Sequence, residues 1–128
     1  MKKLIAIVAL FAGISVNAQT SKFPFGIATP ITVAVTGTTA VTVINNLNYV
    51  ASVPTLTANI NFSVTPSSEL KAGAIILLTV KTTSTETTTF SGSIVAPVVT
   101  GSAGKTWSQA YLYNGTNFYP MGAKIQVD

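Results

Sequence analysis

Carboxylates are the side chains most able to do chemistry here, and the chain has three of them, Glu69, Glu86 and Asp128. A pair held at a fixed separation across a cleft can hydrolyse a glycosidic bond. Glu69 and Glu86 form the only internal pair, but the first lies in a predicted turn and the second in a threonine-rich tract. We therefore interpret them as solvated charges. The chain also lacks His and Cys, which removes the commonest general base and the softer metal ligands.

Two other reactive arrangements have weak support. Ser68 and Lys71 have the spacing of the Ser-x-x-Lys motif of penicillin-recognising enzymes, but that motif belongs to a much larger helical domain, so we treat the match as chance. A Ca²⁺ site built from backbone carbonyls with Glu86 or Asp128 is conceivable, although such sites usually offer more carboxylates. We expect no metal, no cofactor and no enzymatic activity.

A covalent crosslink between lysine and asparagine is a further option. Lys81 or Lys105, an amide of Asn59 or Asn61, and Glu86 supply the residue types. Both asparagines fall on the predicted polar face of a strand, whereas such a reaction needs burial to perturb the reacting groups. We do not expect this bond to form.

The aromatic block near the C-terminus is the main candidate for a ligand or interface surface. It comprises Trp107, Tyr111, Tyr113, Phe118 and Tyr119. If Trp107, Tyr111 and Tyr113 share one strand face and Tyr119 approaches from a hairpin partner, the rings form a platform for stacking sugars. The alternative is that the same rings make the hydrophobic core or a seam between subunits, where their burial contributes most. The sequence favours core or seam, because the opposite side of this strand is only weakly apolar.

The elements that position these residues follow a two-residue period. From Thr55 to Thr65 apolar and polar residues alternate strictly, with Leu56, Ala58, Ile60, Phe62 and Val64 on the dry side. This pattern predicts a strand with one buried and one solvated face. Further strands are predicted at 31–36, 39–45 and, as a covered central strand, 74–81. A turn or single helical turn is predicted at 66–73, and the tract 82–89 reads as a strand, a hairpin tip or both.

The C-terminal region predicts a hairpin. Residues 105–113 alternate, residues 117–120 form the returning strand, and a last edge strand is predicted at 124–127. Asn114-Gly115 between the first two segments is typical of a two-residue type I′ turn, because both central positions need positive φ. Between 90 and 104 we expect loops joining short edge strands.

These elements predict an all-β protein, an antiparallel β-sandwich or jelly-roll-like single domain spanning residues 19–128, without a helix longer than one turn. The chain has no Cys, so stability must come from packing, strand pairing or association of copies. Its lysines are scattered rather than clustered, which argues against a nucleic-acid partner.

Residues 1–18 have the organisation of a signal peptide: Lys2 and Lys3, an apolar run over 4–16, and a small-residue cleavage site ending at Ala18. The run is too short for an ordinary membrane-spanning helix, and membrane contact is expected only through this apolar helix if it is not removed. Gln19 directly after the cut resembles signal peptides of Bacteroidetes. We expect export, to the medium or the cell surface.

The segment 103–123, AGKTWSQAYLYNGTNFYPMGA, resembles a recurrent β-module of bacteriophage structural proteins found in fibres, spikes and capsid surfaces. The shared features are a Lys-Thr lead-in, an alternating strand and a Tyr-Asn-Gly-Thr-x-Phe hairpin. Upstream, the turn 70–74 that feeds an apolar strand is also similar, so the likeness covers roughly residues 55–128. This resemblance implies a building or attachment role, often as a homotrimer, and brings no catalytic residues.

Together these observations predict a non-enzymatic, self-associating structural or attachment module of the cell surface or of a virion. Its expected partners are copies of itself, a trimer being possible, with a cell-surface glycan or other virion or surface proteins. The alternative is a secreted, monomeric glycan-binding module that uses the aromatic hairpin.

Overall fold

The computed structural model describes residues 31–44, 47–51 and 54–127, which contain strands and connections and no helix. The signal helix predicted for residues 1–18 lies outside the described residues. The described strands are β1 (Ile31–Thr32), β2 (Gly37–Val43), β3 (Leu47–Ala51), β4 (Ile60–Pro66), β5 (Ile75–Lys81), β6 (Thr87–Gly92), β7 (Val99–Thr100), β8 (Thr106–Tyr113), β9 (Phe118–Pro120) and β10 (Ile125–Val127).

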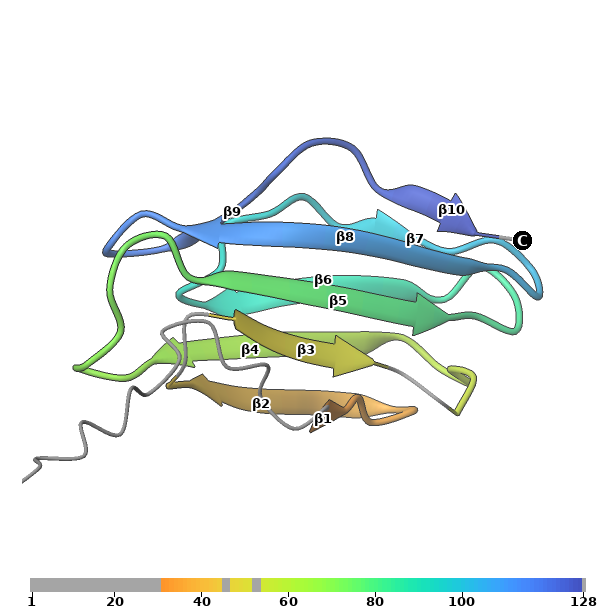
Figure 1. Cartoon of the computed structure of the whole chain (residues 1–128). Helices are drawn as coiled ribbons and strands as arrows, with labels where there is room; N and C mark the ends of the chain where they lie inside the picture. The colour runs from red at the N-terminus through yellow and green to blue at the C-terminus, as the bar shows by residue number, and fades with distance from the viewer. Residues whose placement is uncertain (1–30, 45–46, 52–53, 128) are drawn as a thin grey trace, which may run out of the picture.

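The strands form two sheets packed face to face (Figure 1). Sheet A has the order β1-β3-β5-β8, with β9 and β10 both pairing along the far edge of β8. Sheet B has the order β2-β4-β6-β7. The all-β, two-sheet architecture expected from the two-residue period is therefore confirmed.

The first six strands alternate between the two sheets along the chain, so each strand returns beside the one two places earlier. As a result β1, β3 and β5 are parallel in sheet A, and β2, β4 and β6 are parallel in sheet B. The expectation of a wholly antiparallel sandwich is wrong for this region. Alternating apolar residues fit parallel and antiparallel ladders equally well, so the period does not reveal strand direction.

The C-terminal strands restore the expected antiparallel pairing. β8 runs antiparallel to β5 and to both β9 and β10, and β7 runs antiparallel to β6. Antiparallel neighbours need only short connections, and β8 and β9 are joined by a tight hairpin. One half of the molecule is thus a parallel coil through two sheets, and the other half is antiparallel, with β8 and β9 forming a hairpin.

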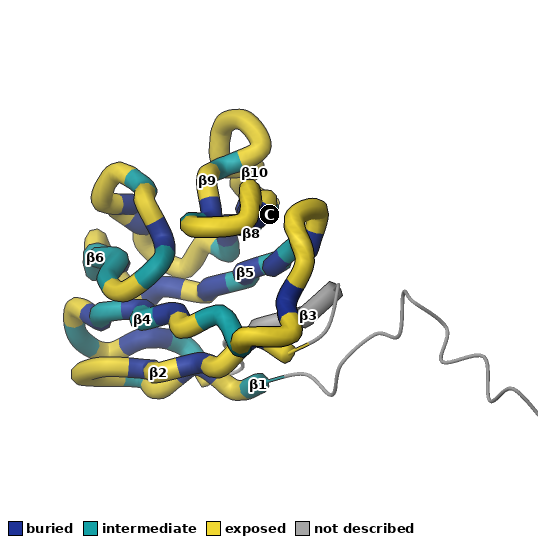
Figure 2. The backbone as a smooth tube through the Cα atoms, turned by 90° about the vertical axis from the view of Figure 1, so that its left-hand side faces the viewer, coloured by how far each residue is buried: buried dark blue, intermediate teal, exposed yellow. Residues whose placement is uncertain are grey.

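The core lies between the sheets, and buried residues alternate with less buried ones along β4, β5 and β8 (Figure 2). Sheet B contributes Ile60, Phe62 and Val64 from β4, and sheet A contributes Ile76, Leu78 and Val80 from β5. The dry side predicted for 55–65 is confirmed for Leu56, Ile60, Phe62 and Val64, but the predicted strand begins only at Ile60. Residues 55–59 instead form bends around Leu56, which makes an isolated bridge to Thr82. Strand β5 is central, as predicted, but its second face is only partly covered.

The sequence left two or more structures open for the segments 82–89 and 66–73. The tract 82–89 supplies a buried bridge residue, a bend and the start of β6, so the strand interpretation holds in part. The hairpin interpretation is wrong, because β5 and β6 belong to different sheets and do not pair. Thr82 is fully buried, and its hydroxyl donates to the carbonyls of Ser102 and Lys105 at 2.7 and 3.2 Å. Residues 66–73 form successive turns, as predicted, without a helical segment.

Candidate functional site

Three of the four rings predicted for a surface lie inside the sandwich. Trp107, Tyr111 and Tyr113 project inward from β8, and Trp107 is only 2% exposed. The ring of Tyr111 contacts Phe90 of sheet B, with 5.5 Å between the ring centroids. These rings therefore tie the two sheets together, as in the core interpretation, and are not available as a platform for sugars.

Tyr119 lies on the opposite side of the sheet from the other three rings, because of how β9 pairs with β8 in the hairpin. It pairs with Leu112, whereas Phe118 pairs with Tyr113, so Tyr119 points outward and is 42% exposed. Successive residues of a strand face opposite sides. A turn centred on Asn114-Gly115 would have paired Tyr119 with Ala110, which also faces outward. With either turn, Tyr119 therefore lies on the opposite side of the sheet from Trp107, Tyr111 and Tyr113.

The hairpin forms where it was predicted, but its turn is displaced by one residue. The N–H of Asn114 donates to the carbonyl of Asn117 at 3.0 Å, which makes Gly115 and Thr116 the central residues. Gly115 has φ of 104°, and the Asn114 Oδ1 accepts from the N–H groups of Thr116 and Asn117, both at 2.9 Å. Asn114 thus acts through its side-chain oxygen rather than through a left-handed backbone.

The two glutamates do not converge. Glu69 lies in the connection between β4 and β5, and Glu86 lies in the connection between β5 and β6 (Figure 1). The whole of β5 separates them, which at about 3.3 Å per residue is roughly 20 Å. The carboxylate of Glu86 accepts the N–H of Ser84 within its own bend, at 2.8 and 3.1 Å.

The remaining reactive combinations are also dispersed. Ser68 and Lys71 are both exposed on turns. The amide of Asn61 donates to the Ser91 hydroxyl at 2.8 Å, and Asn59 accepts the N–H of Thr87 at 2.9 Å, while the candidate lysines are exposed. Within residues 31–44, 47–51 and 54–127, no three acidic, His or Cys side chains come together as metal ligands.

Part of the outer surface of sheet A is apolar, whereas Thr79, Thr106 and Ser108 on the same side are polar. We define face A as the outward side chains Ile75, Leu77, Ala110, Leu112, Tyr119, Ile125 and Val127, with Met121 beside them. Ile125 is 68% exposed and Leu112 is 38% exposed. Large apolar side chains normally avoid such exposure when they are contiguous, and contiguous patches mark interaction sites.

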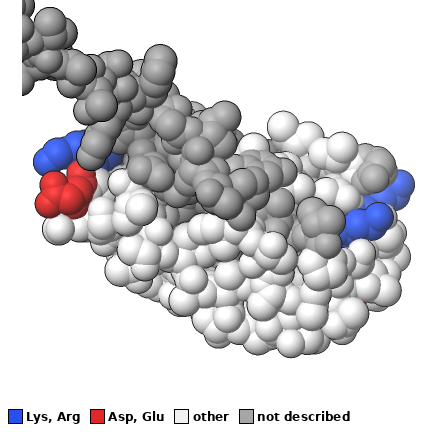
Figure 3. All heavy atoms as spheres, turned by 60° about the horizontal axis from the view of Figure 1, so that its bottom comes forward, with Lys and Arg blue, Asp and Glu red and all other residues white. Residues whose placement is uncertain are grey.

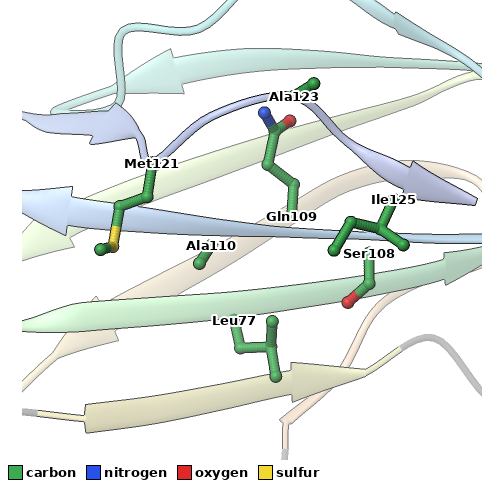
Figure 4. A pocket seen from close by; sticks show the side chains of 7 residues that line it. All are labelled: Leu77, Ser108, Gln109, Ala110, Met121, Ala123 and Ile125. Carbon is green, nitrogen blue, oxygen red and sulfur yellow. The ribbon is translucent and has the colours of Figure 1, made fainter.

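A shallow pocket lies in face A, lined by Leu77, Ser108, Ala110, Met121, Ala123 and Ile125, with Gln109 at its border (Figure 4). Its volume is about 140 Å³, below the roughly 300–1,000 Å³ of ordinary ligand sites. The pocket is therefore suited to a single apolar side chain rather than to a small-molecule substrate.

Two linked hydrogen bonds, both made by the Gln109 side chain, shape one wall of this pocket. Between β9 and β10 the chain arches away from β8, and the Gln109 amide donates across that gap to the carbonyl of Gly122 at 2.7 Å. The Tyr111 hydroxyl donates to Gln109 Oε1 at 3.1 Å. Burial raises the pKa of Tyr111 well above its usual value, so the phenol stays protonated and remains a donor.

The outer surface of sheet B has a different composition. We define face B as Thr38, Ala40, Thr42, Asn61, Ser63, Thr65, Thr87, Thr89 and Ser91. Apart from Ala40 these residues carry hydroxyl or amide groups, and Asn61 also accepts the Thr89 hydroxyl at 3.3 Å. Such a surface is well hydrated without any partner.

Charged side chains of the described residues lie at the ends of strands or in connections: Glu69, Lys71, Lys81, Glu86, Lys105 and Lys124. On the side shown in Figure 3, blue and red groups appear at one end and blue groups at the other, and the described atoms visible between them are uncharged. The basic residues are not gathered on one face, as the scattered lysines of the sequence indicated. Among the described residues, no helix has the length and apolar character needed to span a membrane.

Sequence reasoning missed face A, because Leu112, Ile125 and Val127 were treated as separate residues of short strands. The signal was present in the alternation, since the outward positions of residues 110–112 and 125–127 are apolar.

Comparison with protein-family models, with curated proteins and with solved structures finds no match for this chain.

Proposed function

We propose that this chain is a non-enzymatic structural or attachment module, exported to a cell surface or built into a virion, that assembles with copies of itself through face A. The observation that carries the proposal is the apolar composition of face A, with Ile125, Val127 and Leu112 exposed on one side of one sheet. Burying such a surface between two molecules is favourable by roughly 25 cal/mol per Å² of apolar area.

The chemistry of the rest of the described surface also supports an assembly role. The two carboxylates of the described residues, Glu69 and Glu86, lie beyond opposite ends of β5, and the pocket in face A has the size of a side chain. The apolar side chains around that pocket supply the anchor and socket that a protein contact needs. A second copy of the chain offers both an anchor and a socket, because its face A carries the pocket and the exposed side chains of Ile125 and Tyr119.

The oligomeric state of the protein purified after expression of the full chain tests this proposal. Multi-angle light scattering is expected to give a stable homo-oligomer. Ile125→Glu should lower its mass, because a charge then has to be desolvated in the contact. Val98→Glu is the matched control, since Val98 is similarly exposed but lies in the connection between β6 and β7.

A monomer at every concentration measured would contradict the proposal, and so would an equal loss of mass in the two variants. If that monomer bound a glycan array, a secreted glycan-binding module would replace the structural role. Of the four rings predicted for such a module, only Tyr119 is exposed to contact a sugar.

A further inference from the structure

The edge strands of the two sheets differ in how well they are protected against pairing with another chain. Unpaired backbone groups at an edge attract further strands, and proteins prevent this with short strands, proline or lysine. β1 and β7 have two residues each, β9 has three and ends in Pro120, and β10 has three and directly follows Lys124. Each of these edges carries at least one protective feature.

Strand β2 is the exception among the described edges. Its seven residues, GTTAVTV, include no charge and no proline. It pairs with β4 without a bulge, from Gly37 opposite Ile60 to Val43 opposite Pro66. On its other side no described strand pairs with it.

The free backbone groups of β2 can be assigned to particular residues. The carbonyl of Val43 accepts the N–H of Ser67, at 2.9 Å, so the backbone of Val43 points toward β4. Because the two polar groups of one strand residue point to the same side and the side alternates, Thr38, Ala40 and Thr42 present their N–H and C=O groups to the open edge. The side chains of the same three residues lie on face B and are exposed.

We infer that β2 is the site at which a second copy of this chain adds by strand pairing, joining two copies of sheet B into one continuous sheet. This inference rests on the proposed self-association and adds a second contact, separate from face A. A twofold axis beside Ala40 makes the two β2 strands antiparallel, as a symmetric dimer requires.

The residues of β2 suit that symmetric arrangement. With the axis at Ala40, Thr38 faces the partner's Thr42, and Ala40 faces the partner's Ala40. These are the residues whose backbone groups are free, so about six hydrogen bonds form, two for each facing pair. The small side chain of Ala40 leaves room at the axis, and facing threonines favour strand pairing. Since neither strand carries a charge, no like charges meet across the axis.

Charge substitution at the axis gives a sharp test. Ala40→Lys places two lysines opposite each other and Ala40→Glu places two glutamates opposite each other, and like charges in facing positions oppose pairing. Light scattering on the full-chain product should show an even number of copies in the wild type and half that mass in each variant. An equimolar mixture of the two variants should recover the wild-type mass, which a variant that misfolds does not do. Thr65→Lys adds a charge to face B one strand further in, and should leave the mass unchanged.

Residue-resolved hydrogen exchange of the wild type tests the same contact without any substitution. The amides of Thr38, Ala40 and Thr42 should be protected in the oligomer and lose that protection on dilution to the smaller species. Three results would overturn the inference: an oligomer with an odd number of copies, unchanged masses for both Ala40 variants, or fast exchange of these amides. Each of them would leave self-association through face A standing. Protected amides in a monomer would identify another segment of the same chain as the occupant, and a monomeric wild type would contradict both proposals.

Discussion

Face A and face B cover the same core but expose different side chains. In each sheet the inward positions are large and apolar, such as Phe62 in β4 and Leu78 in β5. Apart from Ala40, the outward positions of sheet B are threonine, serine and asparagine, whereas those of sheet A include the apolar residues Leu112, Ile125 and Val127 beside polar ones such as Thr79 and Ser108. Packing of the core constrains only the inward positions, so it does not account for this difference. Face B is suited to water, and the proposed contact between copies would account for the exposed apolar side chains of face A.

The largest effects are expected on the inner faces, where the two sheets should behave alike. Trp107→Ala in sheet A and Phe62→Ala in sheet B should each lower the free energy of unfolding by about 3–5 kcal/mol, because each leaves a cavity in a closed core. Urea unfolding followed by circular dichroism measures both. If Trp107→Ala retained wild-type stability, its ring would not be part of the core, and a surface role for the aromatic block would return.

A close backbone contact in sheet B gives the next effect. Gly92 has φ of 71°, and a Cβ there would lie 2.3 Å from the carbonyl oxygen of Val64. Gly104 has the same φ with nothing within 4 Å of its Cβ position. Gly92→Ala should therefore cost roughly 1–3 kcal/mol more than Gly104→Ala, the matched control for backbone strain. Equal losses in urea unfolding would mean that β4 and β6 separate easily at this point.

Alkaline pH should act on sheet A alone, because the inner face of sheet B carries no titratable side chain among its described residues. Burial raises the pKa of Tyr111, so the folded protein keeps a neutral phenol where the unfolded chain ionises. The free energy of unfolding should be insensitive to this group below about pH 10 and should fall as pH rises further. Tyr111→Phe should flatten that fall, whereas Tyr119→Phe, a change at an exposed ring, should not. A fall that persists in Tyr111→Phe would assign it to other groups.

Hydrogen bonds on face B should make a smaller contribution. Asn61→Ala removes the bond to Ser91 and should lower the free energy of unfolding by about 0.5–1.5 kcal/mol. Thr42→Ala on the same face should stay within about 0.5 kcal/mol, as exposed substitutions usually do. A neutral result for Asn61→Ala in thermal or urea unfolding would mean that water replaces this bond at no cost.

The smallest effect on stability, with a clear effect on association, is expected on face A. Leu112→Thr combined with Ile125→Thr gives this face the composition of face B and suits a strand equally well. The free energy of unfolding, measured where the protein is monomeric, should change by less than about 0.5 kcal/mol. The mass measured by light scattering should fall. A large loss of stability instead would show that these side chains support the fold and not a contact.

Much of the strand content was predictable because alternation is a local property. The dry side of 60–65, the central strand at 74–81 and the two faces of 105–113 all follow from it, since every second residue of a strand faces the core. The hairpin at Asn114 was likewise predictable from neighbouring residues. The displacement of its turn by one residue was not predictable. An asparagine in a turn can adopt a left-handed backbone or accept hydrogen bonds through its side-chain oxygen, and the sequence does not select between these two roles.

The candidate site was predicted less well. The preference for core over platform was right for Trp107, Tyr111 and Tyr113, but face A was not anticipated. Leu77, Leu112 and Ile125 come from three strands that are distant in sequence, and they become neighbours only when β5, β8 and β10 pair. Such a surface depends on strand order, which no local pattern encodes.

The sequence by itself determined that this protein contains strands with one apolar side and that its charged side chains are few and scattered along the chain. Only the tertiary structure decided that the first six strands run parallel within two sheets and that an unprotected β2 lies at an edge. The physical reason is that side-chain alternation is the same for both strand directions and for every strand order, whereas direction and order are chosen by contacts between residues far apart along the chain.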